Sequence, residues 1–206
     1  LWQKSRALKA RQERAVAPEA AEGLAGGTVH AAANRIETER VHLQLQHTWT
    51  TVMSSSNTRD TVYCRFSSGG TTGVGEGAPI VRYKEDAASA IKAIESVREL
   101  LATADPWQFT KIITEVFKRV EGENAAKAAI DIALMDWVGQ QLKIPLYRYF
   151  GLDKRDAPVT TFSIGIDTPE ITRQKTREAA DYPVLKVKVG LSTDEQTIEA
   201  IRSVTK

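Results

Sequence analysis

The sequence predicts an α+β domain followed by the beginning of an α/β domain. Three observations support this. Three segments of alternating apolar and polar residues with short connections come first, a group of helical segments follows, and strands then alternate with helices. Short connections favour an antiparallel meander, whereas strand–helix alternation favours a parallel sheet. We expect a disordered or helical leader over 1–34, the α+β domain over 35–156 and the α/β part over 157–206.

The composition is that of a globular protein, with 42% hydrophobic and 26% charged residues among 206. A net charge of +2 gives no reason to expect nucleic acid or an acidic membrane as a partner. No apolar run reaches transmembrane length. The single cysteine, Cys64, excludes an intrachain disulfide and a cysteine metal cluster, and we interpret it as a packed structural thiol.

The leader begins with Leu1 and is rich in Ala, Arg, Lys and Glu, without the apolar segment of a signal peptide. The compartment stays unknown from these residues. A cytoplasmic location is favoured, and export after loss of a signal peptide is the open alternative.

The first domain should begin with a three-stranded antiparallel meander. Alternating residues predict strands over 35–46, 60–66 and 71–78, and Ser-Ser-Gly-Gly at 67–70 predicts a hairpin turn between the last two. The Ser/Thr-rich segment 48–57 predicts a mobile loop between the first two strands.

Helices should follow over 85–101, 106–120, 125–141 and 145–150. Pro106 suits the first turn of the second helix. The third helix carries one apolar stripe, made of Ile130, Ala133, Leu134, Trp137 and Val138.

The second domain should contain strands over 159–166 and 184–189, each followed by a helix, over 169–180 and 193–204. A closed eight-stranded barrel needs about 250 residues. We therefore expect the chain to be the N-terminal part of a longer protein.

The second of these strands carries two lysines on one face. Because side chains alternate, Lys186 and Lys188 point the same way with Cα atoms roughly 6.5–7 Å apart. Ammonium groups that close disfavour each other's charged form, and a lysine whose pKa is lowered in this way can act as a general base. A solvated strand face is the alternative. Because parallel strands are covered on both faces, the pair is expected to face the inside mouth of a barrel.

Five motifs in order carry a family resemblance. They are Gly73-Val-Gly-Glu-Gly-Ala-Pro79, Arg82-Tyr83, Ala128-Ala-Ile-Asp-Ile-Ala-Leu-Met-Asp136, Pro145-Leu-Tyr147 and Leu185-Lys-Val-Lys-Val-Gly190. Over about 35–206 the chain resembles the enolase superfamily, its muconate-lactonising branch, and most closely the dipeptide epimerases of the Ala-Glu type. The resemblance implies an α+β capping domain, with a three-stranded antiparallel meander plus helices, followed by the first two βα units of an incomplete (β/α)7β barrel.

The resemblance also implies a reaction and its residues. A proton is removed from a carbon α to a carboxylate or peptide carbonyl, with Mg²⁺ expected to hold the enolate in the full-length protein. Lys188 would be the catalytic acid/base. Lys186 would be its catalytic neighbour and contact the substrate carboxylate, and Ser163 would touch the substrate. A small dipeptide is the expected partner, with a homo-oligomer as the possible assembly of the full-length protein.

Two departures from the family pattern bear on function. The family's three acidic metal ligands and second lysine belong to later barrel strands, beyond Lys206. We therefore expect no metal ligand in this chain and no activity from the fragment alone. Some Ala-Glu epimerases hold the distal acidic group with an arginine, where this chain aligns Ser54. Ser54 is the expected substrate-binding residue there, and a dipeptide without an acidic second residue is plausible.

Other functions stay open at this stage. A muconate cycloisomerase or o-succinylbenzoate synthase would use the same lysine pair, and a non-catalytic α+β module is a third possibility. Gly73-x-Gly75-x-x-Ala78 formally fits a dinucleotide fingerprint, but no helix opens after it, and we interpret it as a flexible glycine turn beside the active-site mouth.

Several single residues are interpreted as structural rather than functional. The three histidines match no metal motif and are expected to be structural, as are the carboxylates on and before the third helix. Trp49 and Met53 are expected either to line the substrate pocket or to pack against the barrel. The residues interpreted as structural are His30, His42, His47, Glu76, Asp131 and Asp136.

Overall fold

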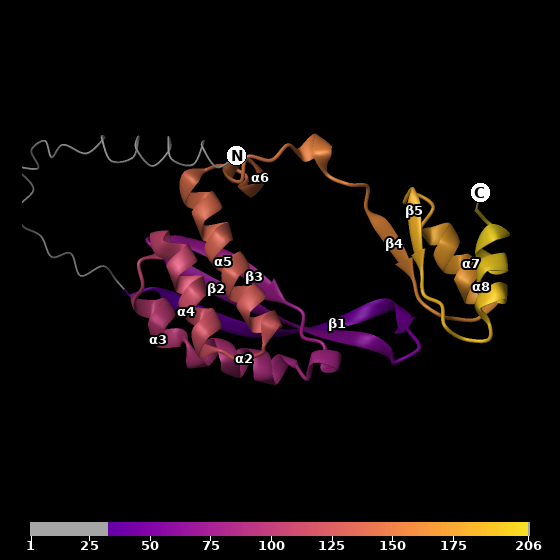
Figure 1. Cartoon of the computed structure of the whole chain (residues 1–206), viewed down its shortest axis with the longest axis horizontal. Helices are drawn as coiled ribbons and strands as arrows, with labels where there is room; N and C mark the ends of the chain where they lie inside the picture. Colours follow the sequence, from indigo (N-terminus) through magenta and orange to yellow (C-terminus); the bar gives the residue numbers. More distant parts are fainter. Residues whose placement is uncertain (1–32, 206) are drawn as a thin grey trace, which may run out of the picture. The chain divides into compact units, whose positions relative to one another are not determined.

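The computed structural model describes residues 33–205, so the predicted leader lies almost wholly outside the described residues. Three strands, β1 (Arg35–Thr50), β2 (Ser55–Ser68) and β3 (Thr71–Gly77), form an antiparallel sheet in the order β1-β2-β3 (Figure 1). The predicted turn between β2 and β3 is confirmed, with Gly69 and Gly70 at positive φ of 57° and 81°. Glycine adopts these angles without the strain that other residues meet.

The first two strands are longer than expected. The predicted loop over 48–57 is wrong, because β1 continues to Thr50, β2 starts at Ser55, and only a short turn separates them. The Thr51 N–H donates to the Ser54 carbonyl across that turn at 2.9 Å. The pairing of β2 with β3 begins at Val62, opposite the last residue of β3. Residues 41–61 therefore form a two-stranded hairpin arm that extends past the end of β3 (Figure 1). Polar sequence did not prevent pairing, because a strand ladder uses backbone groups and threonine favours extended backbone.

Helices α2 (Ala87–Ser96), α3 (Arg98–Thr103), α4 (Phe109–Arg119), α5 (Asn124–Leu142) and α6 (Leu146–Tyr149) follow the sheet. The single helix predicted over 85–101 is divided at Val97, whose φ and ψ of −111° and 11° are not helical. Asp86 caps α2 by accepting from the Ser89 N–H, and the Ser89 hydroxyl accepts from the Asp86 N–H in return. Single 3₁₀ turns lie at Val81–Tyr83, Pro106–Gln108 and Lys154–Asp156.

Glycines on β3 let α5 lie directly on the sheet. A Cβ atom at Gly73, Gly75 or Gly77 would lie 2.0–2.1 Å from a carbonyl oxygen of α5. The oxygens belong to Ala133, Ala129 and Ala125, spaced by one helical turn. The interpretation of these glycines as a flexible turn is therefore wrong. They are buried strand residues with no positive φ, and they serve close packing of backbone on backbone.

Side chains of α5 also bond the outer edge of β3. The Val74 N–H donates to Asp136 Oδ2 at 2.8 Å, and Gln140 Nε2 donates to the Thr72 carbonyl at 2.8 Å. Asp136 therefore has the structural role expected from the sequence. A free strand edge carries unpaired backbone groups, and here the helix supplies partners for two of them.

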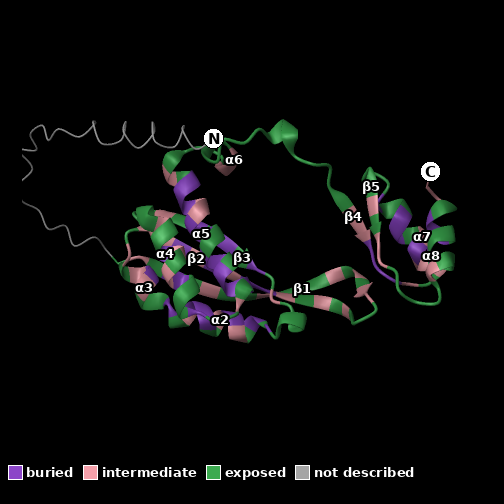
Figure 2. Cartoon of the chain, in the orientation of Figure 1, coloured by how far each residue is buried: buried purple, intermediate pink, exposed green. Residues whose placement is uncertain are grey.

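One apolar core lies between the sheet and the helices (Figure 2). Cys64 is 1% exposed within it, and burial raises the pKa of its thiol to about 12, which agrees with a packed structural cysteine. The largest fully buried side chains of this core are Phe66, Ile94, Leu101, Ile130 and Leu134.

The last part of the described chain alternates as predicted: β4 (Thr161–Ile164), α7 (Pro169–Glu178), β5 (Val184–Val187) and α8 (Asp194–Arg202). The two strands pair in parallel. They are shorter than the predicted 159–166 and 184–189. A smaller set of apolar side chains is buried here: Ile164, Ile166, Ala179, Ala200 and Ile201. Among residues 33–205, no helix has both the length and the hydropathy to cross a membrane.

Candidate active site

The register of the parallel pair brings the predicted site residues to one face. Ser163 on β4 is the direct partner of Lys186 on β5, and the Lys188 N–H continues the ladder by donating to the Ile164 carbonyl at 2.9 Å. Because side chains alternate along a strand, Ser163, Lys186 and Lys188 share a face. Ile164, which is fully buried, and Val187 lie on the other face. Lys188 and Ser163 are half-buried, and Lys186 is exposed.

The end of the hairpin arm lies beside these strand ends. The Ile166 N–H donates to the Thr50 carbonyl at 3.0 Å, directly after β4. Gly190, two residues after Lys188, has a φ of 126°, and a Cβ there would lie 2.8 Å from Cγ1 of Val52. The arm therefore contacts the chain at the carboxyl ends of both parallel strands, the end at which barrel enzymes place their chemistry.

Trp49 of the arm lies near Lys188. The Lys188 ammonium lies 6.0 Å from the centroid of the Trp49 ring, at the outer limit of a cation–π contact. Of the two arm residues considered from the sequence, Trp49 is the one that lines a cavity and meets a predicted catalytic residue. Met53 is 71% exposed.

A cavity of about 410 Å³ lies between the arm, β4 and α7. Ser163 lines it, whereas Lys186 and Lys188 do not. Ser54 also lies away from it, in the exposed turn of the arm, where its carbonyl accepts from the Thr51 N–H. Its predicted contact with substrate stays a prediction. The cavity is lined by Leu45, Gln46, His47, Thr48, Trp49, Arg59, Phe162, Ser163, Gly165 and Lys175.

Two charged residues of α7 that the sequence did not single out contact the arm. Lys175 is 5% exposed, and its ammonium donates to Asp167 Oδ2 at 2.9 Å and to the Thr48 carbonyl at 3.3 Å. The Glu178 carboxylate is hydrogen-bonded to His47, which lowers the pKa of Glu178 together with a bond from Gln174. A lysine on the buried side of an amphipathic helix, beside Thr172 and Thr176, was the available sequence signal.

The donor groups near Lys188 bear on metal binding. Among residues 33–205, no three His, Cys, Asp or Glu side chains come together in a way that could hold an ion. Magnesium prefers a near-octahedral set of oxygens, usually with one or two carboxylates. The described residues do not provide that set near Lys188.

Comparison with known proteins identifies the class. The model of the mandelate racemase / muconate lactonizing enzyme N-terminal domain matches residues 33–151. The chain belongs to this family, and its first domain is the capping domain of the enolase superfamily.

Its curated relatives include dipeptide epimerases. The L-Ala-D/L-Glu epimerase of Bacteroides thetaiotaomicron is 41% identical over 79% of this chain and 43% of its own length. The L-Ala-D/L-amino acid epimerase of Pedosphaera parvula is 35% identical over 78% of this chain and 47% of its own. The chain thus spans about half the length of the relatives it matches.

Solved structures agree in fold and class. The dipeptide epimerase of Enterococcus faecalis, complexed with Mg and L-Leu-L-Tyr, is 29% identical with a TM-score of 0.74, over 85% of this chain and 51% of that one. The substrate-liganded L-Ala-D/L-Glu epimerase of Bacillus subtilis is 26% identical with a TM-score of 0.75, over 84% and 50%. The resemblance drawn from the motifs is confirmed at the level of family and capping domain.

Proposed function

We propose that the chain supplies the capping domain and the first two βα units of a dipeptide epimerase. The observation that carries this proposal is the juxtaposition of Ser163, Lys186 and Lys188 on one strand face, beside an arm that lies at the same strand ends. The dipeptide epimerases among its relatives support the reaction class.

In the proposed reaction Lys188 moves a proton. Its neutral amine takes the hydrogen from the α-carbon of a dipeptide residue, so that the C–H bond breaks, an N–H bond forms and the electron pair passes to the adjoining carbonyl as an enolate. Lys186, two residues away on the same face, is a cation suited to contact the substrate carboxylate. The Ser163 hydroxyl, opposite Lys186 in the register, can donate to or accept from the same substrate.

No step is assigned to a metal. Relatives were solved with magnesium, but the described residues of this chain hold no cluster of carboxylates for it. Inversion also needs a proton returned to the opposite face of the carbon. None of the residues proposed here lies on such a second side.

The substrate class is proposed as a small dipeptide. Relatives named for acidic dipeptides and for hydrophobic ones both match this chain. The arm turn carries the uncharged Ser54 rather than a cation, so an acidic second residue has no partner in that turn.

Exchange of the α-hydrogen tests the proposal. We expect the protein, as its cell produces it, to introduce deuterium from D₂O at the α-carbon of at least one member of a panel of acidic and hydrophobic dipeptides, measured by NMR. Lys188→Ala should slow this exchange by about a hundredfold or more, the usual contribution of an acid/base group. Lys92→Ala is the matched control, because Lys92 is an exposed lysine of α2 and is far from Lys188 in the sequence.

The opposite outcome is equally specific. Exchange with none of the dipeptides, together with turnover of an acid that cyclises, would place the protein in another branch of its family.

A further inference from the structure

We propose that Lys175 and Glu178 of α7 are positioning residues that clamp the hairpin arm, so that Trp49 lies over Lys188. The part of this inference that concerns catalysis rests on the proposed function. The clamp itself rests only on contacts within the described chain.

The first observation concerns the hairpin's own pairing. The ladder between β1 and β2 runs without interruption to Gln44, opposite Thr58, and resumes only at Trp49, opposite Ser56. Residues 45–48 therefore lack regular partners on β2. A segment with few backbone bonds of its own opens at low cost unless another element holds it.

The α7 helix bonds this same segment. Glu178 is hydrogen-bonded to His47 and accepts from Gln46 Nε2 at 3.3 Å, while Lys175 donates to the Thr48 carbonyl at 3.3 Å. Lys175 and Glu178 are three residues apart and so lie on one face of the helix. Three consecutive arm residues are thus held at the place where the strand ladder is broken.

Lys175 is fixed in position by its burial. Its side chain is 5% exposed, and a buried ammonium is costly unless it is paired and hydrogen-bonded. Asp167, in the β4–α7 loop, provides the charge partner at 2.9 Å. The ammonium therefore joins three segments, α7, the loop after β4 and the arm.

Trp49 is held on both sides as a result. Thr48 before it is bonded by Lys175, and Thr50 after it accepts from the Ile166 N–H at 3.0 Å. The indole ring between them lies 6.0 Å from the Lys188 ammonium. Lys175 and Ser163 line the same cavity, but the hydrogen bonds of Lys175 and Glu178 go to the arm, to Asp167 and to Gln174. We therefore assign their effect on the reaction to the position of the arm.

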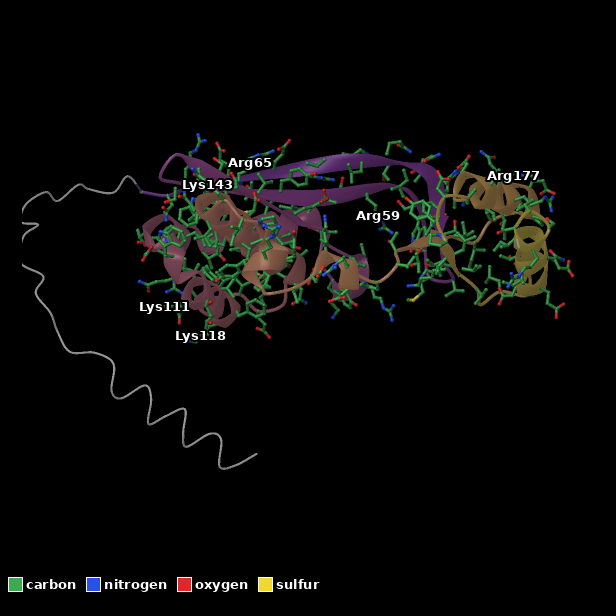
Figure 3. All side chains as sticks on the ribbon, turned by 90° about the horizontal axis from the view of Figure 1, so that it is seen from above. Arg59, Arg65, Lys111, Lys118, Lys143 and Arg177 are labelled. Atoms are coloured by element: carbon green, nitrogen blue, oxygen red, sulfur yellow. The ribbon has the colours of Figure 1, made fainter. Side chains whose placement is uncertain are left out.

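Hydrogen exchange measured by mass spectrometry tests the clamp directly. In the protein as its cell produces it, we expect Lys175→Met and Glu178→Gln to accelerate exchange in peptides covering 45–56 several-fold. Peptides covering 62–77 should not change. Arg177→Met is the matched control, since Arg177 lies on the same helix and is exposed (Figure 3).

Kinetics separate positioning from folding. A loosened arm must be ordered on binding, so KM for the dipeptide should rise several-fold while kcat stays within about twofold. Simple loss of folded protein would lower the apparent kcat and leave KM unchanged. Lys175→Arg, which keeps the cation, should restore part of the affinity.

Each outcome decides one claim. Exchange over 45–56 equal to that of the Arg177 control overturns the clamp, whatever the activity. If Lys175→Met does not fold, Glu178→Gln decides alone, because that carboxylate is exposed. Faster arm exchange without turnover of any dipeptide would overturn the proposed function and leave the clamp standing.

Discussion

Individual glycines determine how near α5 comes to the sheet. Gly73, Gly75 and Gly77 face the carbonyl oxygens of three alanines that repeat every four residues on the helix. A side chain at any of these glycines would force the two backbones apart. The glycines thus explain how α5 can lie so close to β3 between Ala125 and Ala133.

Gly75→Ala is the sharpest test at this scale. Its added methyl group would lie 2.0 Å from the Ala129 carbonyl oxygen, so the helix has to move. We expect the free energy of unfolding to fall by about 1–3 kcal/mol or more, the usual cost of overpacking a core. Urea denaturation measures it. Val74→Ala on the same strand is the control, because Val74 is 39% exposed and points away, and equal losses in both variants would contradict the packing argument.

At the scale of elements, one ion pair joins the helices to the first strand. Arg98 at the start of α3 donates to Glu95 of α2 and to the Ile36 carbonyl of β1 at 2.5 Å, and Glu95 accepts from Thr38 at 3.2 Å. The bond from Arg98 lowers the pKa of Glu95 below its ordinary value. The pair lies just where the predicted single helix divides into two.

This pair predicts a pH dependence of stability. Because the folded-state pKa of Glu95 is lowered, its contribution is present above its ordinary pKa of 4.5 and is lost as the pH falls through the lower folded value. We expect Glu95→Gln to cost about 1 kcal/mol at pH 7, as for a partly exposed pair. The difference from the unsubstituted protein should shrink as the pH falls below 4.5 in denaturant titrations, and a difference as large at pH 3 as at pH 7 would show that the carboxylate charge is not involved.

Sequence patterns predicted the order of the elements better than their ends. Alternation found all three strands of the sheet and both parallel strands, because one face of each strand is apolar. The outer part of the arm was missed because residues 48–57 carry no apolar alternation, and their pairing depends on backbone bonds that any residue can make. The break at Val97 was missed because the apolar spacing continues through it.

At the scale of the whole molecule, the described chain has two unequal cores. The larger one joins the sheet to helices α2–α5, and none of its members comes from β4, α7, β5 or α8. The smaller βα part buries only a few aliphatic side chains and leaves Tyr182, Val184 and Val189 at 40–50% exposure. The parallel sheet of the described βα part consists of β4 and β5, whereas the first sheet has three strands.

The difference predicts unequal protection in the isolated 206-residue chain. We expect amide hydrogens of residues 161–202 to exchange at least about tenfold faster than those of 62–77, because local opening follows the amount of buried apolar contact. The apolar surface exposed by this local opening should also bind a hydrophobic dye. Identical protection in both parts, with no dye bound, would mean that they unfold as one unit.

The candidate site was predictable in part for a physical reason. Two lysines on alternate strand positions must share a face, so Lys186 and Lys188 could be assigned to one face of the strand from their spacing alone. Lys175 and Glu178 could not, because their importance depends on which distant segment α7 meets. The long-range contact with residues 46–48 of the arm has no trace in local sequence pattern.

The bonds from α5 to β3 have a consequence for association between molecules. Asp136 and Gln140 occupy backbone groups of Val74 and Thr72 that a fourth strand would need. A neighbouring polypeptide therefore cannot pair with these groups without first displacing two side chains of α5. The fold limits its own width, and polymerisation through this flank is blocked by the same helix that completes the hydrophobic interior.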